Sequence, residues 1–228
     1  MSAKAIILLS GGLDSALALL MACETSQPVL ALVFDYSQNA ARQEKAAVRK
    51  LTATYDVPMA IMKINFLHPP GTHPLTGQSD KLPQLALNTL DDPALTQASA
   101  HVVWVANRNG TFINIAASLA EQRGVSQIFV GFNREEAATF PDNSLAYVDA
   151  VNQSLSYSTL NHVKVVAPTI AMDKSEIVAE LIKRNFDFNQ IWSCYRDGEK
   201  MCGVCESCLR LKRALSTHKQ EKAIQFAH

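Results

Sequence analysis

The first 64 residues of the chain alternate continuous apolar runs with segments of helical periodicity. The apolar runs at 4–9, 29–34 and 58–64 have the length and composition of parallel strands that are buried on both faces. Between them, apolar side chains recur at helical spacing, after the first run and again over 39–55. This strand–helix alternation predicts an α/β fold with a doubly wound parallel sheet and right-handed crossovers.

The remainder of the chain continues this pattern after one long interruption. The sequence predicts strands at 127–131 and 164–167, a helix at 110–122, and a further helix that Asp173 caps. The interruption spans residues 66–100 and contains five prolines. We predict a long loop there, which is either a mobile lid over a functional site or an inert surface excursion.

Composition narrows the classes of protein that this chain can belong to. A hydrophobic fraction of 48% and a charged fraction of 18% in 228 residues exclude a disordered chain. The 21 basic residues match the 21 acidic ones, which argues against a protein that clamps a long stretch of nucleic acid. No apolar run reaches the roughly 18 residues that a membrane span requires, and no cleavage site follows the N-terminus. We therefore expect a cytoplasmic protein that binds neither nucleic acid nor membranes.

A glycine-rich motif, Ser10-Gly11-Gly12-Leu13-Asp14-Ser15, joins the first predicted strand to the first predicted helix. Consecutive glycines allow a sharp turn close to a ligand, and the free N–H groups at a helix start attract anions. The motif lacks the lysine of a Walker A loop and the spacing of a dinucleotide fingerprint. It predicts a phosphate loop of another type; the alternative is a tight turn with a Ser or Asp helix cap.

Four of the five cysteines fall within fifteen residues near the C-terminus, at Cys-x7-Cys-x2-Cys-x2-Cys spacing: Cys194, Cys202, Cys205 and Cys208. This spacing predicts one tetrahedral Zn(II) per chain, and four protein ligands make such a site structural rather than catalytic. An iron–sulfur cluster is the competing metal, and a redox-active Cys-x-x-Cys pair would leave two thiols unexplained. Cys23 lies on the first predicted helix, where we expect a buried small side chain.

The glycine-rich motif in its strand–helix setting resembles the pyrophosphate loop of the N-type ATP pyrophosphatases. Enzymes of that superfamily cleave ATP between its α and β phosphates and activate their substrate as an adenylate. The resemblance implies an adenine nucleotide α-hydrolase-like (HUP-type) fold, with ATP and Mg(II) as substrate. It places pyrophosphate and magnesium at this loop and adenosine across the carboxyl ends of the first two strands. The implied nucleotide-binding residues are Leu9, Ser10, Gly11, Gly12, Leu13, Asp14, Ser15, Phe34 and Tyr36.

Together with the cysteine segment, the loop makes nearly the whole chain resemble the 7-cyano-7-deazaguanine synthase (QueC) family. The matching segments are Tyr36-Ser37-Gln38 with Glu44, residues 104–109, Gly131, residues 140–142, residues 173–176, and Ser193-Cys194-Tyr195. One departure is Asn143-Ser144, where the family usually has Cys-Arg. Neither residue replaces an arginine that can pair with a carboxylate, so Arg134 and Arg108 become candidates to hold an acid substrate.

The resemblance implies a ligase that uses ATP, 7-carboxy-7-deazaguanine and ammonia to make 7-cyano-7-deazaguanine (preQ0) in queuosine biosynthesis. The reaction would pass through an acyl adenylate and an amide. The implied catalytic residues are Asp14, Ser15, Arg108 and Lys174. Arg108 and Lys174 would neutralise the phosphates; the alternative is that each forms an ordinary surface ion pair. The family suggests an ATP pyrophosphatase-like domain at 1–190 and a zinc-binding segment with a terminal helix at 191–228. It also suggests small-molecule substrates and allows a homodimer.

Three alternative functions remain open at this stage. A QueC-like ligase could join the deazaguanine acid to another amine, such as a protein N-terminus, and Asn143-Ser144 keeps that alternative open. A tRNA-modifying enzyme with the same loop would need a basic surface, which the zero net charge disfavours. A zinc-ribbon regulator with a vestigial loop is disfavoured because the loop motif is intact.

Overall fold

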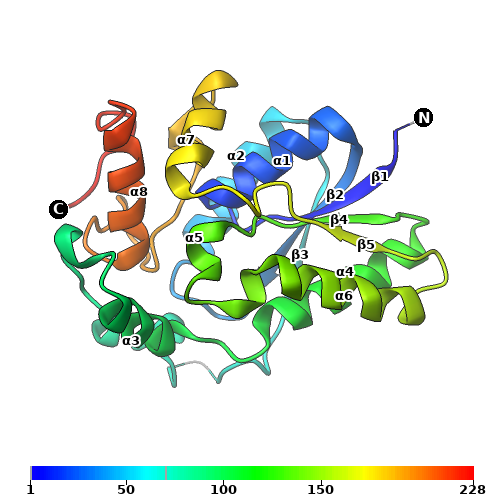
Figure 1. Ribbon diagram of the computed structural model, residues 1–228, viewed down its shortest axis with the longest axis horizontal. Coiled ribbons are helices and arrows are strands. Elements are labelled where there is room, and N and C mark those ends of the chain that lie inside the picture. Colours follow the sequence, from blue (N-terminus) through cyan, green and yellow to red (C-terminus); the bar gives the residue numbers. More distant parts are fainter. Residues whose placement is uncertain (1, 70) are drawn as a thin grey trace.

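The computed structural model, which describes residues 2–69 and 71–228, has a central parallel sheet with helices on both faces (Figure 1). The strand order is β3-β2-β1-β4-β5, and every neighbouring pair is parallel. The strands are β1 (Lys4–Leu8), β2 (Gln27–Asp35), β3 (Met59–Lys63), β4 (Gln127–Phe129) and β5 (Lys164–Val166). The order reverses between β1 and β4, and ligands of such sheets bind at the carboxyl ends of the strands beside that reversal. The predicted doubly wound α/β fold is confirmed.

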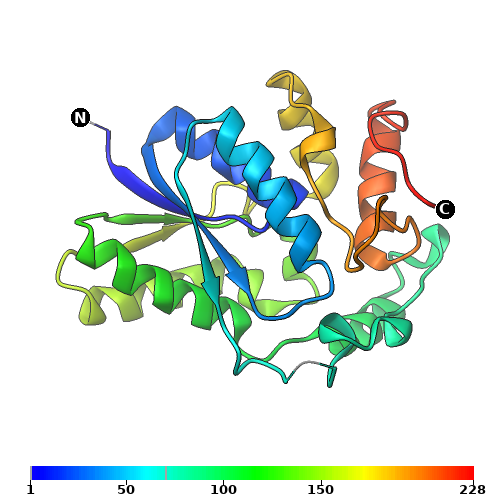
Figure 2. The ribbon, with the colours of Figure 1, turned by 180° about the vertical axis from the view of Figure 1, so that it is seen from behind.

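Helices form one layer on each side of the sheet (Figures 1 and 2). One layer contains α1 (Leu13–Thr25), α2 (Ala41–Thr54), α7 (Lys174–Lys183) and, beyond the sheet, α8 (Glu206–Thr217). The other layer contains α4 (Arg108–Gln122) and α6 (Leu145–Ser158). The short α5 spans Arg134–Ala137, and five single-turn 3-10 helices lie at Pro74–Thr76, Ser79–Lys81, Leu87–Thr89, Pro141–Asn143 and Phe188–Gln190. Among the described residues, no helix is both long and apolar enough to cross a membrane.

Alternation along the strands divides the apolar side chains between two cores. Ala5 and Ile7 of β1 face the α1 layer, whereas Ile6 faces the α4 layer, because successive side chains of a strand point to opposite faces. The core under α1 continues without a break into the cysteine segment, where Cys205 and Cys208 are fully buried. The C-terminal segment therefore packs as part of the main core.

The segment 66–100 differs from the predicted loop. Its last part belongs to helix α3 (Pro93–Val103), which lies beside α8 in both views (Figures 1 and 2). The Asp92 carboxylate accepts hydrogen bonds from the N–H groups of Ala94 (2.9 Å) and Leu95 (3.1 Å). Proline at the first helical position loses no hydrogen bond, and its fixed φ suits the helix. The sequence analysis counted Pro93 among the prolines of a long loop, whereas the capped Asp-Pro pair begins a helix.

Helix α6 is absent from the sequence-based predictions, and its burial explains why. Only Val148 and Leu155 of this helix are fully buried, so its apolar periodicity is weak. Its start is nevertheless well defined, because the Ser144 hydroxyl oxygen accepts a hydrogen bond from the Tyr147 N–H (3.2 Å).

Candidate active site and metal centre

A cavity of about 250 Å³ opens at the carboxyl ends of β1, β2 and β4, next to the reversal of strand order. It brings together side chains that are far apart in the sequence. All four predicted catalytic residues line it, as do all the predicted nucleotide-binding residues except Gly11: Leu9, Ser10, Gly12, Leu13, Asp14, Ser15, Phe34, Tyr36, Arg108 and Lys174. The structure therefore brings the predicted site residues together around one cavity, and their roles stay predictions.

Two glycines give the glycine-rich loop its shape. Gly11 has a φ of +81°, and a Cβ there would lie 2.9 Å from both the Ala47 Cβ and the Glu44 carbonyl oxygen of α2. Gly131, which follows β4, is equally constrained, because its Cβ would lie 2.6 Å from the backbone nitrogen of Ser15. Gly131 appeared in the family resemblance, but its role in supporting the loop becomes visible only in three dimensions.

The start of α1 is open to a ligand. Its N-cap is Gly12, which has no side chain to accept a hydrogen bond from the first turn. The alternative of a Ser or Asp helix cap is therefore not what the structure has. The Ser15 hydroxyl donates to the Gly12 carbonyl oxygen (3.1 Å) and lies 3.1 Å from the Ser10 hydroxyl. The N–H groups of a helix start, with hydroxyls beside them, form a site suited to a phosphate.

Lys174 forms a buried ion-pair cluster at the floor of the cavity rather than a surface ion pair. Its ammonium donates to Asp14 Oδ2 (2.7 Å) and to Glu136 Oε1 (2.8 Å), and its side chain is 6% exposed. Burial raises the pKa of Asp14 to about 6, against the opposing effect of Lys174. Although burial alone would lower it, the two carboxylates hold the pKa of Lys174 well above its ordinary value. The second carboxylate oxygen, Asp14 Oδ1, is buried without a hydrogen-bond partner among the described residues, and a cation such as Mg(II) would satisfy it.

Arg108 offers the cavity a positive charge that no described carboxylate pairs with. It begins α4, and its Nη1 donates a hydrogen bond to the Tyr36 hydroxyl (3.4 Å). Arg134 lies elsewhere: it bonds Asp173 and Glu176 at 3.1 Å each and does not line the cavity. The prediction that Arg134 could hold an acid substrate is therefore wrong. Arg108 remains as the arginine in position to do so.

The two residues that depart from the family pattern have different positions. Asn143 is buried and lines the cavity, whereas Ser144 caps α6. Only Asn143 is therefore placed to contact a substrate. The cavity also contains residues that the sequence did not assign to the site: Gln38, Glu44, Glu136, Trp192, Ser193 and Tyr195. The family resemblance could have pointed to four of these residues, because they lie in matching segments: Gln38, Glu44, Ser193 and Tyr195. No sequence signal pointed to Glu136.

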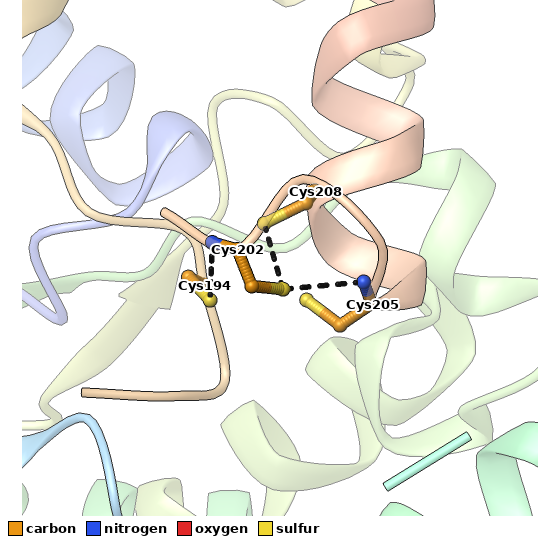
Figure 3. Close-up of side chains that lie close together, drawn as sticks. All are labelled: Cys194, Cys202, Cys205 and Cys208. Carbon is orange, nitrogen blue, oxygen red and sulfur yellow. Dashed lines mark hydrogen bonds between the residues drawn. The ribbon is translucent and has the colours of Figure 1, made fainter. Parts of the chain in front are cut away.

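The four clustered cysteines converge in space (Figure 3). Their sulfur atoms all lie within 4.8 Å of one another, and Cys202 Sγ is 3.9 Å from Cys208 Sγ. Cys194 Sγ accepts backbone N–H groups from Arg196 (3.3 Å) and Cys202 (3.4 Å), as metal-bound thiolates commonly do. With bonds of about 2.3 Å, a tetrahedral ion holds its sulfurs roughly 4 Å apart, so the cluster fits one ion. Cys23, by contrast, is exposed, so its predicted burial is wrong.

The metal centre and the glycine-rich loop are directly connected. The Trp192 N–H donates to the Gly11 carbonyl oxygen (2.8 Å), and the Leu13 N–H donates to the Ser193 hydroxyl (3.4 Å). Trp192, Ser193, Cys194 and Tyr195 all line the cavity. The segment that leads into the cysteines is therefore one wall of the candidate active site.

The sheet, the glycine-rich loop at the end of β1 and the cavity at the strand reversal define the class: a PP-loop protein with an adenine nucleotide α-hydrolase-like fold. A solved structure with this fold is "U34-tRNA thiolase NcsA from Methanococcus maripaludis with its [4Fe-4S] cluster". It superposes with a TM-score of 0.51 and 13% identity, covering 97% of this chain and 67% of that one. At this identity the likeness concerns the fold alone.

Within this class, the chain belongs to the QueC family. The family model described as "Queuosine biosynthesis protein QueC" matches residues 4–219. A relative from Pelotomaculum thermopropionicum, named 7-cyano-7-deazaguanine synthase, is 46% identical over 94% of this chain and 97% of its own length. A relative of the same name from Methanosarcina mazei is 44% identical over 92% of this chain and 93% of its own. The resemblance drawn from the motifs is confirmed.

Proposed function

We propose that this chain is an ATP-dependent ligase that converts 7-carboxy-7-deazaguanine and ammonium into 7-cyano-7-deazaguanine (preQ0), a step of queuosine biosynthesis. The observation that carries the proposal is the convergence of three features on one cavity in a member of the QueC family. These features are an open glycine-rich loop, Arg108 with no ion-pair partner among the described carboxylates, and the buried Lys174–Asp14 pair. They suit adenylation, in which catalysis consists mostly of positioning and charge stabilisation.

In the first half of the reaction, the substrate carboxylate attacks the α-phosphate of ATP and pyrophosphate leaves. The N–H groups at the start of α1, with the Ser10 and Ser15 hydroxyls, bind the departing pyrophosphate. The Asp14 carboxylate would hold Mg(II), which neutralises phosphate charge. Lys174 keeps that carboxylate oriented, because it bonds Asp14 Oδ2 and leaves Oδ1 without a partner among the described residues. Phe34 and Tyr36, at the end of β2, border the adenosine.

In the second half, ammonia displaces AMP from the acyl adenylate and an amide forms. The amide oxygen then attacks a second ATP, and loss of AMP leaves the nitrile. Arg108 is the cavity residue suited to an anion throughout, either the substrate carboxylate or the phosphate that replaces it. Asn143 supplies amide hydrogen-bonding groups in place of the cysteine that the family usually has at this position.

The four cysteines hold one structural Zn(II) in this proposal. A [4Fe–4S] cluster places four irons between its thiolates and needs the sulfurs farther apart than a single ion does. The 4.8 Å limit on the sulfur separations therefore favours one ion. Elemental analysis should find one zinc per chain. Iron with visible absorbance would refute this assignment.

The proposed partners are small molecules alone: the deazaguanine acid, ammonium and ATP, in the cytoplasm and without nucleic acid or membrane. The balance of 21 basic and 21 acidic residues supports this. The two parts, 1–190 and 191–228, share one hydrophobic core. We therefore propose that they differ in function, ATP use against metal binding, rather than as separate folding units. Light scattering decides whether a homodimer forms.

The test is to incubate the protein with ATP, Mg(II), ammonium and 7-carboxy-7-deazaguanine and to identify the products by mass. The proposal expects the nitrile, AMP and pyrophosphate, with ATP consumed only when the acid is present. ADP and orthophosphate would overturn it. A mass increase on a protein amine would favour the ligase that joins the acid to another amine, and turnover dependent on tRNA would favour a tRNA-modifying enzyme.

A further inference from the structure

Three carboxylates line the cavity, and one of them has a different setting from the other two. Asp14 and Glu136 both form ion pairs with Lys174. Glu44, in the first turn of α2, is in no ion pair among the described residues. Its Oε2 instead accepts a hydrogen bond of 2.6 Å from the Gln38 side-chain amide. Glu44 is therefore the cavity carboxylate whose charge no lysine or arginine neutralises directly.

The Gln38 amide fixes the orientation of this carboxylate. Gln38 is buried, its Oε1 accepts from the Tyr36 N–H (2.9 Å), and its Nε2 also donates to the Phe34 carbonyl oxygen (3.1 Å). With Oε2 held in this way, Glu44 Oε1 has no hydrogen-bond partner in the described part of the chain. Oε1 is not fully enclosed by the described residues, and Glu44 lines the cavity. Oε1 therefore faces the space that the substrates would occupy.

The charges around Glu44 come from three elements. Arg108 faces it from α4, Asp35 from the end of β2, and Lys45 from α2 itself, where Lys45 is bonded to Asp35 at 2.6 Å. Burial raises the pKa of Glu44 to about 7, whereas the Gln38 hydrogen bond and Arg108 oppose that rise. A carboxylate that gains and loses protons near neutral pH is matched to general base catalysis.

The proposed reaction needs such a group, because ammonium has no lone pair with which to attack the acyl adenylate. Resting on the function proposed above, we propose that Glu44 is the general base that deprotonates ammonium in the cavity. Ammonium transfers one proton to Oε1, and the freed lone pair forms the C–N bond to the acyl carbon. The C–O bond to AMP then breaks, AMP leaves, and a second proton passes from the new amide nitrogen to water.

The test compares nucleophiles of different protonation state in the Glu44→Gln variant. Glutamine keeps the shape and can still accept the hydrogen bond from Gln38, but it cannot take a proton. Acid-dependent exchange of pyrophosphate into ATP, which needs no ammonium, should stay within about threefold of wild type. Amide formation from ammonium at about pH 7 should fall at least about 100-fold, and raising the pH to about 9 should restore much of it, because free ammonia then supplies the lone pair. Hydroxylamine, which is largely neutral at about pH 7, should form the hydroxamate at the wild-type rate.

The matched control is Glu121→Gln, which removes a carboxylate at the far end of α4, outside the cavity, and should change none of these rates. Equal losses with ammonium and hydroxylamine would make Glu44 a structural residue and overturn the proposal. An unchanged rate with ammonium would also overturn it. If the wild-type protein forms no adenylate at all, the proposed function fails and the role of Glu44 fails with it. If instead the wild-type protein forms the adenylate and the Glu44→Gln variant reacts with ammonium at the wild-type rate, the role of Glu44 fails and the proposed function stands.

Discussion

Gly131 lies against the backbone of the glycine-rich loop and leaves no room for a methyl group. A Cβ at this position would lie 2.6 Å from the Ser15 nitrogen and 2.7 Å from the Asp14 carbonyl carbon. Gly131→Ala should therefore displace the loop, lower the affinity for ATP at least about tenfold and cost about 1–3 kcal/mol of stability, as overpacking does. Calorimetric titration with ATP measures the first effect and urea unfolding the second. Gly124→Ala is the control, because its Cβ would meet nothing within 4 Å and its strain lies far from the loop. Equal ATP affinity in the two variants would contradict the assignment.

Glu44 should make the protein less stable as the pH rises from about 4.5 toward 7. Burial raises its pKa from 4.5 to about 7, so the folded protein keeps a proton that the unfolded chain loses above about pH 4.5. The free energy of unfolding contributed by this group is then highest below pH 4.5 and decreases as the pH rises toward 7. Glu44→Gln removes that decrease, so the variant should be more stable than wild type near pH 7 by up to about 3 kcal/mol. Urea unfolding at several pH values measures the difference, and a variant that is less stable near pH 7 would refute this account.

Site residues that are neighbours in the sequence could be predicted, whereas those that only folding brings to the site could not. The loop from Ser10 to Ser15 and the four cysteines each form their site from neighbours in the chain, so spacing and composition sufficed. Glu136 reaches the site only because α5 places it beside Lys174, 38 residues away in sequence. Arg134, two residues earlier, bonds Asp173 and Glu176 and does not line the cavity. No sequence pattern distinguishes these two positions.

At the level of elements, the start of α3 depends on a single cap. Asp92→Ala removes the acceptor for the N–H groups of Ala94 and Leu95 and should cost about 0.5–2 kcal/mol. The loss should appear in hydrogen exchange as faster exchange over residues 94–97, with the sheet unaffected. Asp80→Ala is the control, because this exposed residue caps no helix. Unchanged exchange at the start of α3 would mean that packing against α8, rather than the cap, fixes this helix.

The contacts of α3 also explain why the segment 66–100 was harder to predict than the sheet. Its partners lie more than a hundred residues away: the Ser99 hydroxyl donates to Glu206, and Arg213 pairs with Asp91 at 2.8 Å. A strand of the sheet shows its burial in a continuous apolar run. This segment instead contacts α8 through separate polar pairs, which leave no periodic pattern in the sequence. The lid function of this segment remains a prediction.

Across the whole molecule, the metal centre should influence ATP binding, although its four cysteines are expected to bind the metal rather than ATP. Trp192 bonds Gly11, and Ser193 accepts the Leu13 N–H from 180 residues away. Because residues 192–195 form one wall of the cavity, loss of the metal should free that wall. Cys205→Ser should release the metal, weaken ATP binding at least about tenfold, and speed hydrogen exchange at residues 11–15 as well as at 194–208. Cys23→Ser, at an exposed thiol, should change none of the three. Full ATP affinity in a metal-free protein would show that these hydrogen bonds do not couple the metal centre to ATP binding.

The central claim is that this member of the QueC family activates an acid by transferring AMP to its oxygen, twice, with the cavity at the strand reversal as the site. The most direct measurement follows oxygen-18 from the carboxylate of 7-carboxy-7-deazaguanine through a turnover with ATP and ammonium. Each adenylation moves one carboxylate oxygen to phosphorus, so both labelled oxygens should appear in AMP, one in each molecule, and the product should be the unlabelled nitrile. Label in orthophosphate together with ADP, or AMP without label, would contradict the account.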